Sequence, residues 1–81
     1  MALLPTTTLD AVAPGEQVTI LTLRGEGAVT QRLAEMGMVP GAHLTVVRYA
    51  PMGDPLEISL HGYHLSLRRR EAALVEVSRC R

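Results

Sequence analysis

Three histidines are the side chains of this sequence best suited to metal chemistry. His61 and His64 flank a predicted hairpin tip in the segment ISLHGYHLS, and His43 begins a neighbouring predicted strand. Imidazole binds divalent metals such as zinc and iron. Residues three apart on an ideal strand face opposite sides, so His61 and His64 converge only if the turn bends them together. Structural zinc sites usually contain several cysteines, so two readings stay open: histidines without a native metal, or a weak divalent metal site at the surface or across an interface.

No catalytic set is evident in the sequence. The Ser-His neighbourhood of ISLHGYHLS has no carboxylate placed to orient a base. The segment GEG at 25–27 has neither the lysine nor the flanking pattern of a phosphate loop. Cys80, the single cysteine, lies beside the C-terminus, where a spectator thiol is expected. We therefore expect a protein that is not an enzyme and requires no cofactor.

The segment YAPMGDP is the best candidate for a protein contact. It places Tyr49, Pro51 and Met52 in a predicted loop, where side chains are normally polar. Methionine adapts to binding surfaces, and tyrosine is a frequent anchor of interfaces. The alternative is that Tyr49 and Met52 close one end of the fold. Two tyrosines are too few for the aromatic groove that binds proline-rich peptides.

The run Arg68–Arg70 could attract phosphate or RNA, or it could lie on a solvated turn. In the second case its charges would pair with nearby acids, for which Glu57, Glu71 and Glu76 are the candidates. Stacking aromatic residues are nearly absent, which disfavours nucleic acid as a partner. Arg68 and Arg69 remain candidates for the polar rim of a protein contact.

Length and charge exclude several classes of protein. A chain of 81 residues forms one domain at most, with a thin core. Its formal net charge is zero and lysine is absent, so it has neither the basic surface of a dedicated nucleic-acid binder nor a polybasic lipid anchor. No apolar run is long enough to insert into a membrane, and one cysteine suits a reducing compartment. We expect a cytoplasmic protein.

Hydrophobic periodicity places these residues on short elements. Alternation predicts strands at 17–23, 43–49 and 74–77, with both faces of the first covered or nearly so, and a hairpin with Leu56, Ile58 and Leu60 on one strand and Leu65 and Leu67 on the next. Helical spacing of Val29, Leu33 and Met36 predicts a helix over 28–36. Single helical turns are expected near 9–12 and 68–73, and the hairpin turn at 61–63.

Glycines predict how the helix ends and the next strand begins. Gly37 is suited to a left-handed stop that lets Met38 fold back onto the last turn, as in a Schellman motif. The sequence from Val39 to Ala42 is typical of a type II turn, with Pro40 and Gly41 at its centre.

These elements predict a mainly β fold. Five short strands, with one helix between the first and second, bury their apolar face best as a small SH3-like barrel. We expect a single domain over 1–81, with its core at 9–77 and flexible ends at 1–8 and 78–81. An open barrel edge could pair with a second copy and form a weak homodimer.

The sequence resembles the FeoA family of ferrous iron transport proteins. The matching segments are RLAEMGMVPG, RYAPMGDP, Gly62, LSLRRREA and VEV, together with the opening LDAVAPGEQVTI. The resemblance implies a small cytosolic accessory protein whose partner is the membrane ferrous iron transporter with a GTP-binding domain (FeoB-like). The alternative is a metal-responsive module related to the SH3-like C-terminal domain of metal-dependent repressors. Because the chain starts at Met1 without a DNA-binding domain, a free-standing FeoA is expected.

Overall fold

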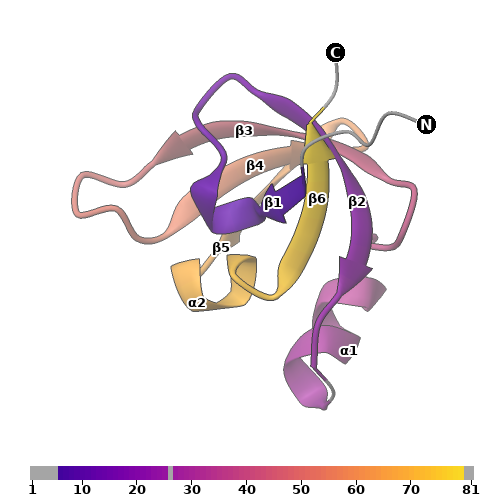
Figure 1. Ribbon diagram of the computed structural model, residues 1–81. Helices are drawn as coiled ribbons and strands as arrows, with labels where there is room; N and C mark the ends of the chain where they lie inside the picture. The colour runs from indigo at the N-terminus through magenta and orange to yellow at the C-terminus, as the bar shows by residue number, and fades with distance from the viewer. Residues whose placement is uncertain (1–5, 26, 80–81) are drawn as a thin grey trace.

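A computed structural model describes residues 6–25 and 27–79 of the chain. Its elements run in the order β1 (Thr6–Thr8), η1 (Leu9–Ala11), β2 (Gln17–Leu23), α1 (Ala28–Glu35), β3 (His43–Tyr49), β4 (Leu56–Leu60), β5 (Tyr63–Leu67), α2 (Arg69–Ala72) and β6 (Val75–Arg79). Figure 1 shows β1, β6 and β2 in front of β3, β4 and β5, with α1 and α2 below them. No helix among the described residues is long and apolar enough to cross a membrane.

The strands form one antiparallel sheet in the order β1-β6-β2-β3-β4-β5. The described part of the chain thus forms a mainly β, six-stranded open sheet, so the prediction of five strands was wrong in its count. The additional strand is β1, whose three threonines pair with residues 76–78 of β6. Helix α1 consequently lies between the second and third strands.

Two β-bulges bend the sheet and decide which side chains face inward. Pairing moves from Ile20 to Thr22 along β2 and from Val46 to Arg48 along β3, so Leu21 and Val47 are extra residues. Both point outward, with exposed fractions of 38% and 36%. The prediction that both faces of β2 are covered was therefore wrong at Leu21, which follows the buried Ile20 and so faces solvent.

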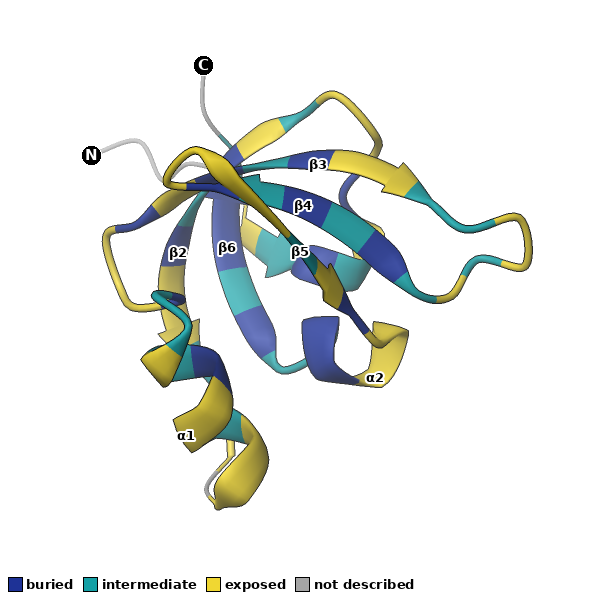
Figure 2. Cartoon of the chain, turned by 180° about the vertical axis from the view of Figure 1, so that it is seen from behind, coloured by how far each residue is buried: buried dark blue, intermediate teal, exposed yellow. Residues whose placement is uncertain are grey.

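The core lies between the two layers of strands and is aliphatic. Figure 2 shows buried residues alternating with less buried ones along β2, β3 and β4. The largest fully buried side chains are Leu9, Ile20, Leu33, Met38, Leu44, Leu56, Ile58, Leu60 and Leu67. Helix α1 contributes Leu33, while Val29 is 40% exposed because the first turn of α1 extends away from the sheet.

The predicted end of the helix is confirmed. The amide of Met38 donates to the carbonyl of Leu33, and the amide of Gly37 donates to that of Ala34, which is the Schellman pattern. Gly37 has φ +100°, as its left-handed position requires. The turn from Val39 to Ala42 follows directly, closed by a hydrogen bond of 3.0 Å between its two end residues.

The chain ends differ from the expectation of flexible segments at 1–8 and 78–81. Residues Thr6–Thr8 form β1, and β6 continues to Arg79, because the ends pair with each other and with β2. The strands thus extend beyond the predicted core of 9–77 at both ends. The other residues of the expected flexible ends, 1–5 and 80–81, lie outside the described residues, as does Cys80.

Candidate functional site

The three histidines do not gather into one site. His61 occupies the hairpin turn with φ +53°, and its ring lies over Gly37. His64 pairs with Ser59 across β4 and β5. His43 begins β3, with its Nδ1 atom 2.9 Å from the hydroxyl of Thr19. Among residues 6–25 and 27–79, no three His, Cys, Asp or Glu side chains could hold one metal ion. The assignment of His43, His61 and His64 to a surface or interface metal site therefore stays a prediction.

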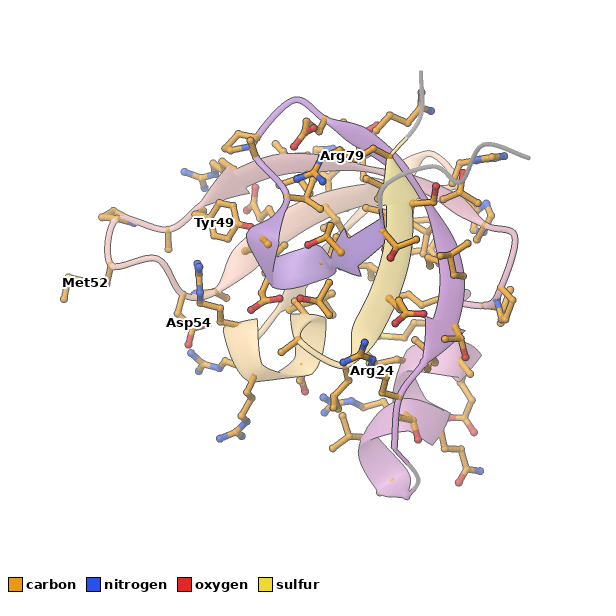
Figure 3. The ribbon with its side chains drawn as sticks, in the orientation of Figure 1. Arg24, Tyr49, Met52, Asp54 and Arg79 are labelled. Carbon is orange, nitrogen blue, oxygen red and sulfur yellow. The ribbon has the colours of Figure 1, made fainter. Side chains whose placement is uncertain are left out.

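The loop between β3 and β4 projects Met52 into solvent. This side chain is 92% exposed and lies at the outer tip of the loop in Figure 3. Helix α2 anchors the base of the loop: the Arg69 amide donates to Asp54 Oδ1 at 3.0 Å, and its guanidinium donates to the Gly53 carbonyl at 3.2 Å. The loop is thus an exposed apolar tip on an anchored base.

Tyr49, by contrast, faces the interior. Its hydroxyl lies 2.7 Å from the carbonyl of Val12 and 3.1 Å from that of Asp10, just after and within η1. The Arg69 guanidinium covers its ring, 5.1 Å from the centroid. Burial raises the pKa of the phenol, and the Arg69 charge opposes that rise. The two alternatives for this segment therefore separate: Tyr49 closes one end of the fold, and Met52 is free for contact.

The three glutamates that were expected to neutralise the side chains of Arg68–Arg70 form ion pairs with other arginines. Glu57 binds Arg48 at 3.1 Å, and Glu76 binds Arg24 at 2.6 Å. Glu71, which is buried, pairs with Arg32 of α1 and also accepts the Arg68 amide at 2.9 Å. The hydrogen bond from Arg48 lowers the pKa of Glu57. The predicted pairing of the Arg68–Arg70 side chains was therefore wrong.

A groove of about 500 Å³ lies between α1, the end of β5, and α2. Its lining combines three arginines and one glutamate with apolar and small residues: Arg32, Met36, Pro55, Ser66, Leu67, Arg68, Arg70 and Glu71. The sequence pattern did not predict this groove, because its walls come from three separate segments of the chain: 32–36, Pro55 and 66–71. Only the arginine run indicated a charged surface here.

Comparison with known proteins places the chain among iron transport proteins. The FeoA domain model matches residues 7–79. A fusion of Fe(2+) transport protein A and the Fe(2+) transporter FeoB from Porphyromonas gingivalis is 41% identical over 69 residues, which are 85% of this chain but 8% of the fusion protein. A FeoA-like protein from Clostridium acetobutylicum superposes with a TM-score of 0.89 at 32% identity, covering 98% of this chain and 92% of that one.

Two further structures define the fold. Stenotrophomonas maltophilia FeoA, a prokaryotic SH3 domain protein complexed with zinc, has a TM-score of 0.81 at 27% identity and covers 93% of this chain and 96% of its own. A manganese-dependent transcriptional repressor has a TM-score of 0.86 at 15% identity over 99% of this chain and 45% of its own, which is a likeness of fold. The SH3-like prediction is confirmed, and the family model spans nearly the whole described chain. The chain belongs to the FeoA family of ferrous iron transport proteins.

Proposed function

We propose that this protein is a small cytoplasmic accessory protein of ferrous iron uptake, which binds the cytosolic part of a FeoB-like membrane transporter with a GTP-binding domain. The observation that carries the proposal is the Porphyromonas gingivalis fusion, in which a segment 41% identical to this chain is joined to FeoB in one polypeptide. Covalent linkage raises the effective concentration of one module near another. A separate chain would need a docking surface of its own.

The loop carrying Met52 supports this proposal. A methionine that is 92% exposed adds no burial to the fold, yet its flexible thioether adapts to a partner surface. Arg69 fixes the loop base through Asp54 and Gly53, so the loop loses little conformational entropy when a partner binds. We propose Met52 and Pro51 as direct contacts, with Arg68 and Arg69 beside them and Tyr49 bracing the loop from inside.

The experiment is a titration of the purified cytosolic domain of the transporter with wild type and with Met52→Asp. We expect the substitution to weaken binding at least tenfold, because a carboxylate would have to be desolvated in an apolar contact. Val39→Asp is the matched control, since this side chain is also exposed, at 42%, and lies elsewhere in a turn. Melting temperatures of both variants should stay near that of wild type.

The proposal fails if wild type binds neither the domain nor the intact transporter and a deletion strain takes up ferrous iron normally. Equal binding by wild type and Met52→Asp would refute the loop as the contact while leaving the partner in place.

The metal-responsive alternative has weaker support. It draws on the zinc complex of Stenotrophomonas maltophilia FeoA, but the histidines of this chain do not converge within the described residues. A zinc site would therefore need a ligand from a second copy or a partner. A rise in melting temperature with zinc, absent when His43, His61 and His64 are all changed to Ala, would favour this alternative.

A further inference from the structure

The groove between α1, β5 and α2 carries positive charge that the described part of the chain does not neutralise. Arg32, Arg68 and Arg70 line it together with a single carboxylate, Glu71, which already binds Arg32. Within residues 6–25 and 27–79, neither Arg68 nor Arg70 forms an ion pair. The whole chain is electrically neutral, so two unpaired guanidiniums in one groove are a local concentration of charge that favours an anionic ligand.

The same groove lies at the C-terminal end of a free strand edge. β5 lies at the end of the sheet, and β4 is its only strand neighbour among the described residues. Leu60 and Tyr63 close a hairpin with a two-residue turn, so their backbones exchange hydrogen bonds with each other. In an antiparallel pair only every second residue bonds to the neighbouring strand in this way, so the residues next to Tyr63 and Leu65 do not bond to β4. The backbone amides and carbonyls of His64 and Ser66 therefore point away from β4 and can receive another strand.

Apolar groups lie among the charges of the groove. Met36, just after α1, and Pro55, just before β4, line it beside Leu67. Met36 is held in place because its carbonyl accepts the hydroxyl of Tyr63 at 2.6 Å. A ligand that fits this lining has carboxylates on some side chains and aliphatic groups on others, which an extended chain presents on its two faces.

We propose that the groove binds an extended acidic segment of a partner protein, which adds to β5 as a seventh strand. Its backbone pairs with His64 and Ser66, and its carboxylates meet Arg68 and Arg70. Arginine suits this role because its planar fork binds a carboxylate through two hydrogen bonds. Main-chain pairing supplies affinity, and the arginines select acidic sequences. The inference extends the proposed function, since the transporter is the partner expected to supply this segment.

The test uses two ligands and one pair of variants. The first ligand is a capped peptide of alternating glutamate and valine, and the second is the cytosolic domain of the transporter. The groove variant is Arg68→Gln with Arg70→Gln. Its matched control is Arg24→Gln with Arg48→Gln, which removes the same charge from outside the groove. Amide chemical shifts of the labelled full chain locate the binding site.

We expect the glutamate peptide to shift the amides of His64 and Ser66, and the groove variant to lose about tenfold in affinity while the control loses little. Added salt should weaken binding. A peptide with lysine in place of glutamate should leave these amides unchanged. The transporter domain should likewise bind wild type and the control variant with similar affinity and the groove variant more weakly.

Four results would overturn the inference. The peptide produces no shift at β5; the two double variants bind it equally; a single-stranded RNA shifts these amides in its place; or the shifts appear on raising the protein concentration alone, which would identify a second copy as the occupant. If the transporter domain fails to bind wild type, the proposed function fails, and the peptide measurement alone then decides whether the groove binds an extended acidic segment. If that domain binds all three proteins equally and the peptide is inert, the groove inference fails and the proposed function stands.

Discussion

Substituting Gly37 by alanine tests whether the helix stop and the hairpin tip support each other. Gly37 has φ +100°, and a Cβ atom there would lie 3.3 Å from Cδ2 of His61 and 3.4 Å from the hydroxyl of Tyr63. That hydroxyl in turn donates to the carbonyl of Met36, one residue before the glycine. Any side chain at this position therefore strains the backbone and presses on the tip of the β4–β5 hairpin.

The expected loss has two parts. A non-glycine residue in the left-handed region costs about 1–2 kcal/mol. Displacing the His61 ring from its rotamer adds about 0.5–1 kcal/mol, because the ring is exposed and can move. Gly37→Ala should thus lower the free energy of unfolding by about 1.5–3 kcal/mol.

Gly41→Ala provides the matched control. Its φ of +91° is similar, but nothing lies within 4 Å of the added Cβ. It should lose about 1–2 kcal/mol from backbone strain without the contact. Urea denaturation followed by circular dichroism measures both variants, with m-values checked for equality.

A second background isolates the contact. In a His61→Ala protein, Gly37→Ala should cost about as much as Gly41→Ala, because the displaced ring is gone. Coupling is measurable in such a cycle when it exceeds about 0.3–0.5 kcal/mol. If Gly37→Ala costs the same with and without His61, the packing of the helix stop against the hairpin tip does not contribute to stability, and the reasoning is wrong.

Two further predictions concern the opposite end of the fold. Tyr49→Phe should lower the free energy of unfolding by about 1–2 kcal/mol in urea denaturation, because the hydroxyl is the donor to two η1-region carbonyls; an unchanged midpoint would argue against that role. The hydrogen bond from the Ala13 amide, and after it the one from Arg79, lower the pKa of Glu16 below its ordinary value of 4.5. The Glu16 carboxylate therefore stabilises the fold fully above pH 4.5, and this contribution is lost as the pH falls through the lower pKa of the folded state. Wild type should therefore exceed Glu16→Gln in melting temperature at neutral pH, and the difference should shrink on acidification below pH 4.5; a constant difference would count against the ion pair.

The elements that could be predicted are those fixed by neighbouring residues. The glycine stop after α1, the turn from Val39 to Ala42 and the hairpin turn at His61 and Gly62 all depend on backbone freedom within a few residues. The alternation of Leu56, Ile58 and Leu60 likewise predicts an inward face, and all three are fully buried. Such features are readable because their physical cause is local.

The bulges show where local pattern fails. Leu21 and Val47 follow the buried residues Ile20 and Val46 and so face outward, and the extra residue at each bulge then shifts the alternation by one position. The same shift returns Tyr49 to the interior, where its hydroxyl bonds near η1. Which residue of a strand is skipped depends on the neighbouring strand, so neither Tyr49 nor Met52 could be assigned to core or surface from the loop sequence alone.

The sequence by itself indicated the family, through its resemblance over residues 9–77, and it determined the mainly β class and the local stops and turns, because these follow from residue types at short spacing. Tertiary structure alone decided the sixth strand, the separation of the three histidines and the choice of partner for each arginine. A carboxylate pairs with whichever guanidinium the fold brings nearest, and Arg32 reaches Glu71 across 39 positions of sequence. That choice leaves Arg68 and Arg70 unpaired among the described residues, beside the free edge of β5.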